Sequence, residues 1–151
     1  MSGSALKIGE LAKMTGSQVE TVRYYEREGL LPAPHRSEGN YRLYDLAHVE
    51  HLQFVLRCRS LDMTLNEIRE LLKFRDAPEK NCGAVNELLD HHIGHVTTRI
   101  AELQSLENQL KKLRKLCEKS QMARDCQILQ GLSKPQSAKT KKLASHGRGC
   151  C

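Results

Sequence analysis

With 151 residues, 39% of them apolar and no tryptophan, the chain has room for one compact domain or for a small domain joined to an extended element. Its net charge of +6 is weak evidence for a nucleic-acid partner, because five of the positive charges fall in residues 133–151, a segment without acidic residues. A run of about 18 apolar residues, which a membrane-spanning helix requires, is missing from the sequence, and residues 1–7 lack the apolar core of a secretion signal, so we expect a cytoplasmic protein with no membrane partner.

Two short helices joined by a glycine-containing turn are predicted at the start of the chain. The first spans residues 8–14. The second, over residues 17–28, begins with the capping-box pattern from Ser17 to Glu20 and stops at Gly29. This arrangement is typical of a helix-turn-helix, whose second helix enters the major groove of DNA.

A wing and two further helices are expected next. Residues 38–40 are a turn signal and residues 41–44 alternate in a β-prone pattern, so a small hairpin is predicted over residues 35–44. A third helix is expected over residues 45–59, capped by Asp45, and a fourth over residues 64–74, opened by a capping box at Thr64.

Residues 1–75 are therefore interpreted as a winged helix-turn-helix DNA-binding domain with its connecting helices. Arginine can read guanine or hold phosphate, and tyrosine hydroxyls commonly bind phosphate. The alternative is that these side chains form the ordinary surface of a small helical domain, with the tyrosines partly in its core. The candidate DNA contacts are Gln18, Arg23, Tyr24, Tyr25, Arg27, Arg36, Tyr41 and Arg42.

One long helix dominates the second half of this mostly α-helical chain. Over residues 81–117, apolar side chains recur at spacings of three, four or seven, which is the pattern of a coiled-coil seam. Such a stripe needs a partner, and the simplest partner is a second copy of the chain. We expect a loop and short helix over residues 118–132 and a disordered basic tail over residues 133–151.

Three cysteines are placed so that one copy of the chain cannot easily bring them together. Cys82 begins the long helix and Cys117 ends it, about 50 Å away on a continuous helix. If two copies pack antiparallel, Cys82 of one lies beside Cys117 and Cys126 of the other. Paired residue numbers then add up to about 199, so the helices cross near residues 99 and 100.

Thiolates in such a pocket would select soft or borderline metals. In a reducing cytosol, cysteines are more readily metal ligands or packed thiols than disulfides. Each cysteine could instead be an inert buried thiol, and this is the interpretation we give to Cys58 in the third helix.

A candidate auxiliary metal site combines the long helix with the tail. His92 and His95 share a helix face at i, i+3 spacing, and His146, Cys150 and Cys151 could complete the ligand set. We favour the alternative, a solvated polar face and a flexible tail.

Four motifs carry a resemblance to a known family: Ile8-Gly-Glu-Leu-Ala12, Val22-Arg-Tyr-Tyr-Glu26, Gly29-Leu-Leu-Pro32 and Asn40-Tyr-Arg-Leu-Tyr44. They look like the signature of the mercury-resistance regulator (MerR) family, and the match covers roughly residues 6–132. The resemblance implies a homodimer of winged DNA-binding domains joined by an antiparallel coiled coil. It implies binding to a promoter whose spacer is too long for RNA polymerase, which inducer binding corrects by distorting the DNA.

The sequence around the cysteines is similar to the lead- and cadmium-responsive branch of that family, at residues 57–63, 82–93 and 126–130. Three thiolates suit Pb(II), whose lone pair leaves one side of the ion open, whereas Cd(II) would want a fourth donor. We therefore expect Cys82, Cys117 and Cys126 to bind Pb(II) or Cd(II) as the inducer of metal-resistance genes.

Other functions stay open at this point. One is a member of the same family that responds to Hg(II) or Zn(II). A second is a redox sensor in which Cys117 and Cys126 form a disulfide. A third is a metal-sequestering protein with incidental DNA affinity. An enzyme is not expected, because the sequence shows neither a phosphate loop nor a nucleophile–base arrangement.

Overall fold

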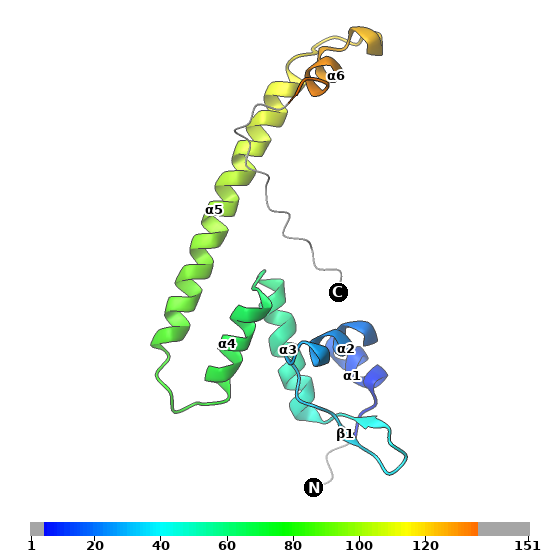
Figure 1. Cartoon of the computed structure of the whole chain (residues 1–151), viewed down its shortest axis with the longest axis vertical. Helices are drawn as coiled ribbons and strands as arrows, with labels where there is room; N and C mark the ends of the chain where they lie inside the picture. Colours follow the sequence, from blue (N-terminus) through cyan, green and yellow to red (C-terminus); the bar gives the residue numbers. More distant parts are fainter. Residues whose placement is uncertain (1–4, 136–151) are drawn as a thin grey trace. The chain divides into compact units, whose positions relative to one another are not determined.

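The computed structural model describes residues 5–135, which are mostly helical with one two-stranded sheet (Figure 1). These residues form two compact units, one ending at Leu88 and the other beginning at Leu89. In the described part, no helix is long and apolar enough to cross a membrane. The predicted disordered tail lies outside the described residues from position 136 onward.

The first two helices form the predicted helix-turn-helix. α1, Ile8–Thr15, ends at Gly16, whose φ of 69° is the left-handed conformation that glycine adopts without strain. α2, Val19–Arg27, follows, and Gly29 beyond its end has a φ of 72°. α1 packs against both α2 and α3.

The start of α2 differs from the predicted capping box. Gln18 rather than Ser17 is the N-cap, and among the described residues no side chain caps this end. Thr15 Oγ1 donates to the Leu11 carbonyl at 2.9 Å and lies 2.9 Å from Ser17 Oγ. The Ser17 hydroxyl therefore bonds within the turn, one residue before the helix begins.

The predicted wing is present. β1, His35–Arg36, pairs antiparallel with β2, Arg42–Leu43, with Arg36 opposite Arg42. The turn between the strands closes through the Asn40 N–H, which donates to the Ser37 carbonyl at 2.9 Å. A bridge between Leu6 and Tyr44 ties the hairpin to the segment before α1.

Both predicted caps of the following helices are confirmed. α3, Leu46–Ser60, begins at Asp45, whose Oδ1 accepts from the His48 N–H at 3.1 Å. α4, Leu65–Arg75, begins with the Thr64 capping box: Thr64 Oγ1 accepts from the Glu67 N–H, and the Glu67 carboxylate accepts from the Thr64 N–H at 2.8 Å.

The core of the first unit is made by α1, α2, α3, α4 and the end of the wing. Its fully buried side chains are Leu11, Val22, Tyr25, Leu30, Tyr44, Leu52, Val55 and Ile68. Arg69 of α4 adds a polar tie, donating to the Glu28 carbonyl at 2.8 Å and to its carboxylate at 3.0 Å. This tie fixes the end of α2 to α4.

The long helix α5, Gly83–Arg114, is shorter at both ends than the predicted residues 81–117. Its first turn is held by the Cys82 carbonyl, which accepts from the Val85 and Asn86 N–H groups. At the other end, Arg114 Nη1 donates to the Cys117 carbonyl at 2.8 Å.

A loop with a 3-10 turn, η1 (Ala123–Asp125), leads to the predicted short helix, α6 (Gln127–Leu132), which folds back beside the end of α5 (Figure 1). Gly131 makes this approach close, because a Cβ there would lie 3.5 Å from Leu116 Cδ1 and 3.7 Å from Leu113 Cδ1.

Candidate functional site

The exposed side of α2 and the wing together form a basic pocket of about 270 Å³. Its lining contains three guanidinium groups, from Arg23, Arg27 and Arg42, together with Ile8 and Glu26. Thr21, Val22 and Tyr25 are the buried face of α2, and this burial turns Arg23 and Arg27 toward solvent. Three cations against one carboxylate suit an anionic ligand such as a DNA phosphate.

Glu26 organises the pocket, and the sequence prediction missed it. Its carboxylate accepts from Arg42 Nη1 at 3.2 Å and from the Tyr44 hydroxyl, so one side chain of α2 holds two residues of the wing. Burial, with the hydrogen bond to Glu26 and its charge, raises the pKa of Tyr44 to about 12. Tyr44 therefore remains a hydrogen-bond donor at neutral pH.

The remaining wing residues project from the hairpin. Arg36 Nη1 donates to the Asn40 carbonyl at 3.2 Å, and Tyr41 is 71% exposed. A Cβ at Gly39 would lie 2.9 Å from Tyr41 Cε2, so a larger residue there would displace the exposed Tyr41 ring. Arg36 and Tyr41 are both exposed on the hairpin, and their contact with DNA stays a prediction.

Tyr25 is a correction to the predicted DNA contacts. Its side chain is only 1% exposed and belongs to the core, whereas its neighbour Tyr24 is half-buried at the core's edge. The i, i+3 spacing from the buried Val22 was the sequence signal for this outcome. Tyr25 positions α2 instead of reaching DNA.

Cys117 and Cys126 lie together in the loop that joins α5 to α6. The Cys117 thiol donates to the Lys119 carbonyl at 3.3 Å and accepts from Gln121 Nε2 at 3.7 Å. The Leu129 N–H is the main cause that holds the pKa of Cys126 below its usual range, and a side-chain hydrogen bond with Cys117 adds to it. Two thiols in partial contact with solvent are thus ready to act as soft ligands.

Cys82 is exposed at the opposite end of α5, and this helix of 32 residues is about 48 Å long. The four cysteines within residues 5–135 are free thiols. Cys58 is buried in α3, and burial raises the pKa of its thiol, which fits the inert role expected for it.

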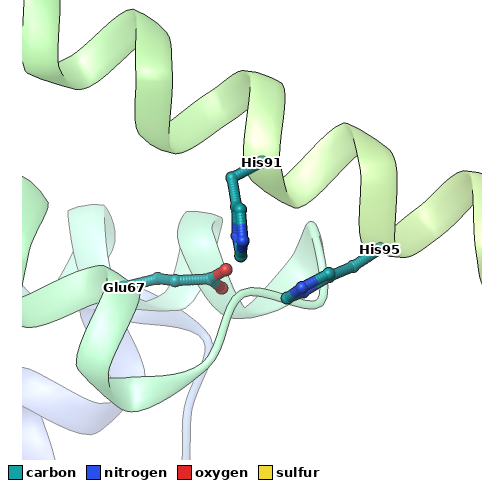
Figure 2. Close-up of side chains that lie close together, drawn as sticks. All are labelled: Glu67, His91 and His95. Carbon is teal, nitrogen blue, oxygen red and sulfur yellow. The ribbon is translucent and has the colours of Figure 1, made fainter.

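Two histidines of α5 lie in ring contact. His91 and His95, one turn apart, have ring centroids 4.4 Å apart, and Figure 2 shows both side chains on successive turns of α5. His92, which shares a helix face with His95 in the candidate auxiliary site, is buried. The other candidate members of that site, His146, Cys150 and Cys151, lie outside the described residues.

A winged helix-turn-helix followed by a long helix is the architecture of a DNA-binding regulator. Residues 6–74 match the family described as MerR HTH family regulatory protein, and residues 49–113 match the one described as MerR, DNA binding. A Haemophilus influenzae protein named HTH-type transcriptional regulator ZntR homolog is 47% identical over 109 residues, which cover 72% of this chain and 81% of that protein. The chain belongs to the MerR family of helix-turn-helix transcriptional regulators.

Two solved structures are similar over most of the chain. PbrR691 from Ralstonia metallidurans, in complex with lead(II), is 53% identical with a TM-score of 0.76, covering 85% of this chain and 99% of that one. A MerR regulator from Bacillus megaterium, in complex with the mercury(II) ion, is 30% identical with a TM-score of 0.64, covering 85% and 100%. The family consists of transcription regulators, which confirms the expectation that this chain is not an enzyme.

Proposed function

We propose that this protein is a metal-responsive transcriptional activator that binds promoter DNA as a homodimer. Its inducer is Pb(II), with Cd(II) as a second candidate, held by Cys82 of one copy and Cys117 and Cys126 of the other. Occupation of this site leads the dimer to distort its promoter, so that RNA polymerase can start transcription of metal-resistance genes.

The observation that carries the proposal is the register of exposed apolar side chains on α5. Leu89 and Leu110, Ile93 and Leu106, and Val96 and Leu103 are all exposed, and each pair of residue numbers adds up to 199. The pair Cys82 and Cys117 has the same sum. An antiparallel pairing that covers the apolar stripe therefore also brings the cysteines together.

The same register would cover apolar surface that one chain exposes to solvent. Ile93, 60% exposed in one chain, would be covered by Leu106 of the other.

The residues at the proposed site fit a soft metal ion. The Cys117 and Cys126 sulfurs share one loop, and their thiols are open to solvent in part. A bound Pb(II) would supply a cationic centre that links three thiolates from two chains. The chain's own contribution is to hold the two loop sulfurs close and to present Cys82 at the start of α5.

The choice of Pb(II) draws support from PbrR691, which was solved with lead(II) at 53% identity. The Bacillus megaterium regulator with mercury(II) makes Hg(II) a competing inducer and so motivates a competition experiment. Zn(II) is included in that experiment as a borderline ion.

The decisive test is a competitive titration of the reduced dimer with Pb(II), Cd(II), Hg(II) and Zn(II), followed through thiolate-to-metal charge-transfer absorbance. We expect preferential Pb(II) binding that is lost in Cys82→Ser. Cys58→Ser is the matched control and should bind as the wild type, because its thiol is buried in α3. Dominant Hg(II) binding with little response to Pb(II) would move the protein to a mercury sensor.

The proposed DNA contacts are those that remain after removal of Tyr25: Gln18, Arg23, Tyr24, Arg27, Arg36, Tyr41 and Arg42. The three arginines of the basic pocket can hold backbone phosphate, and the major groove is left to the exposed side of α2.

A substitution in the pocket tests this assignment. Arg23→Ala should weaken promoter binding and lower the slope of log affinity against log salt by about one, because one phosphate contact is lost. Lys111→Ala removes the same charge from α5 and should leave both quantities unchanged. Fluorescence anisotropy across salt concentrations measures both quantities. Equal losses of promoter affinity in the two variants would mean that net charge, and not a contact of Arg23, causes the effect.

A further inference from the structure

The side-chain amide of Gln121 lies between the two loop cysteines. Its Nε2 donates to the Asp125 carbonyl at 2.8 Å, directly before Cys126, and to Cys117 Sγ at 3.7 Å. One amide nitrogen therefore contacts the sulfur at one side of the loop and the backbone at the other.

The orientation of this amide follows from its partners. A backbone carbonyl can only accept, so the group that faces Asp125 must be the NH₂ and not the amide oxygen. That NH₂ carries two hydrogens, which is enough to serve the carbonyl and the sulfur at the same time.

Gln130 offers a comparison within the same loop. Its Nε2 donates to the Arg124 carbonyl at 3.3 Å, one residue before the Gln121 contact. Two glutamine amides thus hold consecutive carbonyls ahead of Cys126. Of these two amides, Gln121 is the one that contacts a sulfur.

We propose that Gln121 is a positioning residue for the metal-binding thiolates, which fixes the spacing of Cys117 and Cys126 and donates an N–H···S bond to Cys117. The inference rests on the proposed function, because it concerns the same sulfurs. A sulfur that binds a metal carries no proton and loses its bond to the Lys119 carbonyl. The bond from Gln121 then persists and strengthens, because its acceptor becomes charged.

The test compares Gln121→Leu with Gln130→Leu, since leucine removes the amide without adding a donor atom that could bind the metal. We expect Gln121→Leu to weaken Pb(II) binding by about tenfold, the lower end for loss of a partner that orients a metal ligand. Gln130→Leu should weaken it less. The sulfur-to-lead charge-transfer band should shift only in Gln121→Leu, because only this variant loses a donor to sulfur. Far-ultraviolet circular dichroism checks that both variants are folded.

A metal-free arm separates this inference from the proposed function. In ¹⁵N spectra of the metal-free protein, Cys117→Ala should move the side-chain NH₂ signals of Gln121 and leave those of Gln130 unchanged. If the wild-type protein failed to bind Pb(II), the proposed function would be overturned. The metal-free spectra would still show whether Gln121 contacts Cys117. Unmoved Gln121 signals, or equal losses in both leucine variants with an unshifted band, would overturn the role of Gln121 at sulfur.

Discussion

At the scale of single residues, Glu26 and Tyr44 set how the wing meets α2. Tyr44 is 1% exposed, and its hydroxyl donates to the Glu26 carboxylate, which also accepts from Arg42. A buried phenol beside a carboxylate resists ionisation, because its anion would lose water and face a like charge. This resistance is why the pKa of Tyr44 is raised to about 12 from 10.0.

The raised pKa predicts a loss of stability at high pH. The unfolded chain releases the Tyr44 proton near pH 10, while the folded chain keeps it up to about 12. The contribution of this group is therefore complete below pH 10 and is lost as pH rises from 10 to 12. By pH 11.5 the free energy of unfolding should fall by about 2 kcal/mol more in the wild type than in Tyr44→Phe.

Urea unfolding of both proteins between pH 8 and pH 11.5 measures this difference. The exposed Tyr41 supplies the control, because Tyr41→Phe should retain the full wild-type decline. Parallel pH curves for wild type and Tyr44→Phe would contradict the assignment of the proton to Tyr44.

At the scale of elements, the capping patterns at Asp45 and Thr64 predicted where α3 and α4 begin, because their hydrogen bonds join residues three apart and need no tertiary information. The same pattern at Ser17 failed, since its hydroxyl bonds to Thr15 in the preceding turn. A sequence pattern shows that a hydroxyl is available but not which of two nearby partners it takes.

The same distinction between local pattern and tertiary contact applies to the residues of the candidate sites. Cys82, Cys117 and Arg23 could be chosen from sequence, because helix length and helix face follow from local periodicity. Glu26 and Gln121 could not, since the first acts on a wing 16 or more residues away and the second depends on the path of an irregular loop. These two residues organise sites whose more conspicuous members the sequence had already indicated.

The apolar stripe of α5 predicts that one charge can separate the copies. Ile93→Glu should shift the protein from dimer to monomer, with the dissociation constant raised more than about 100-fold, because each of two copies loses about 1.5–3 kcal/mol of apolar burial. Gln109→Glu adds the same charge on the face of α5 opposite the stripe and should remain dimeric. Sedimentation equilibrium measures both, and a dimeric Ile93→Glu would argue against the pairing register.

At the scale of the whole molecule, the proposal assigns the site to two chains rather than to one. A twofold dimer repeats each contact at both ends, so each end combines Cys82 of one chain with Cys117 and Cys126 of the other. Neither chain alone needs a complete ligand set. Two variants that each lack a different ligand should therefore form one complete metal site when they are combined in a mixed dimer.

Mixed dimers provide that measurement. Cys82→Ser and Cys117→Ser should each lack the three-thiolate absorbance of bound Pb(II) as homodimers. Co-expressed with two affinity tags and purified as a mixed dimer, they should recover it. One end then joins the intact Cys82 of the second variant to the intact Cys117 and Cys126 of the first. A mixed dimer of Cys117→Ser with Cys126→Ser should not show this absorbance, because both of its ends lack a loop thiol. A first mixture without the absorbance would mean that the ligands come from a single chain. Absorbance in the second mixture would mean that Cys117 and Cys126 of one site come from different chains.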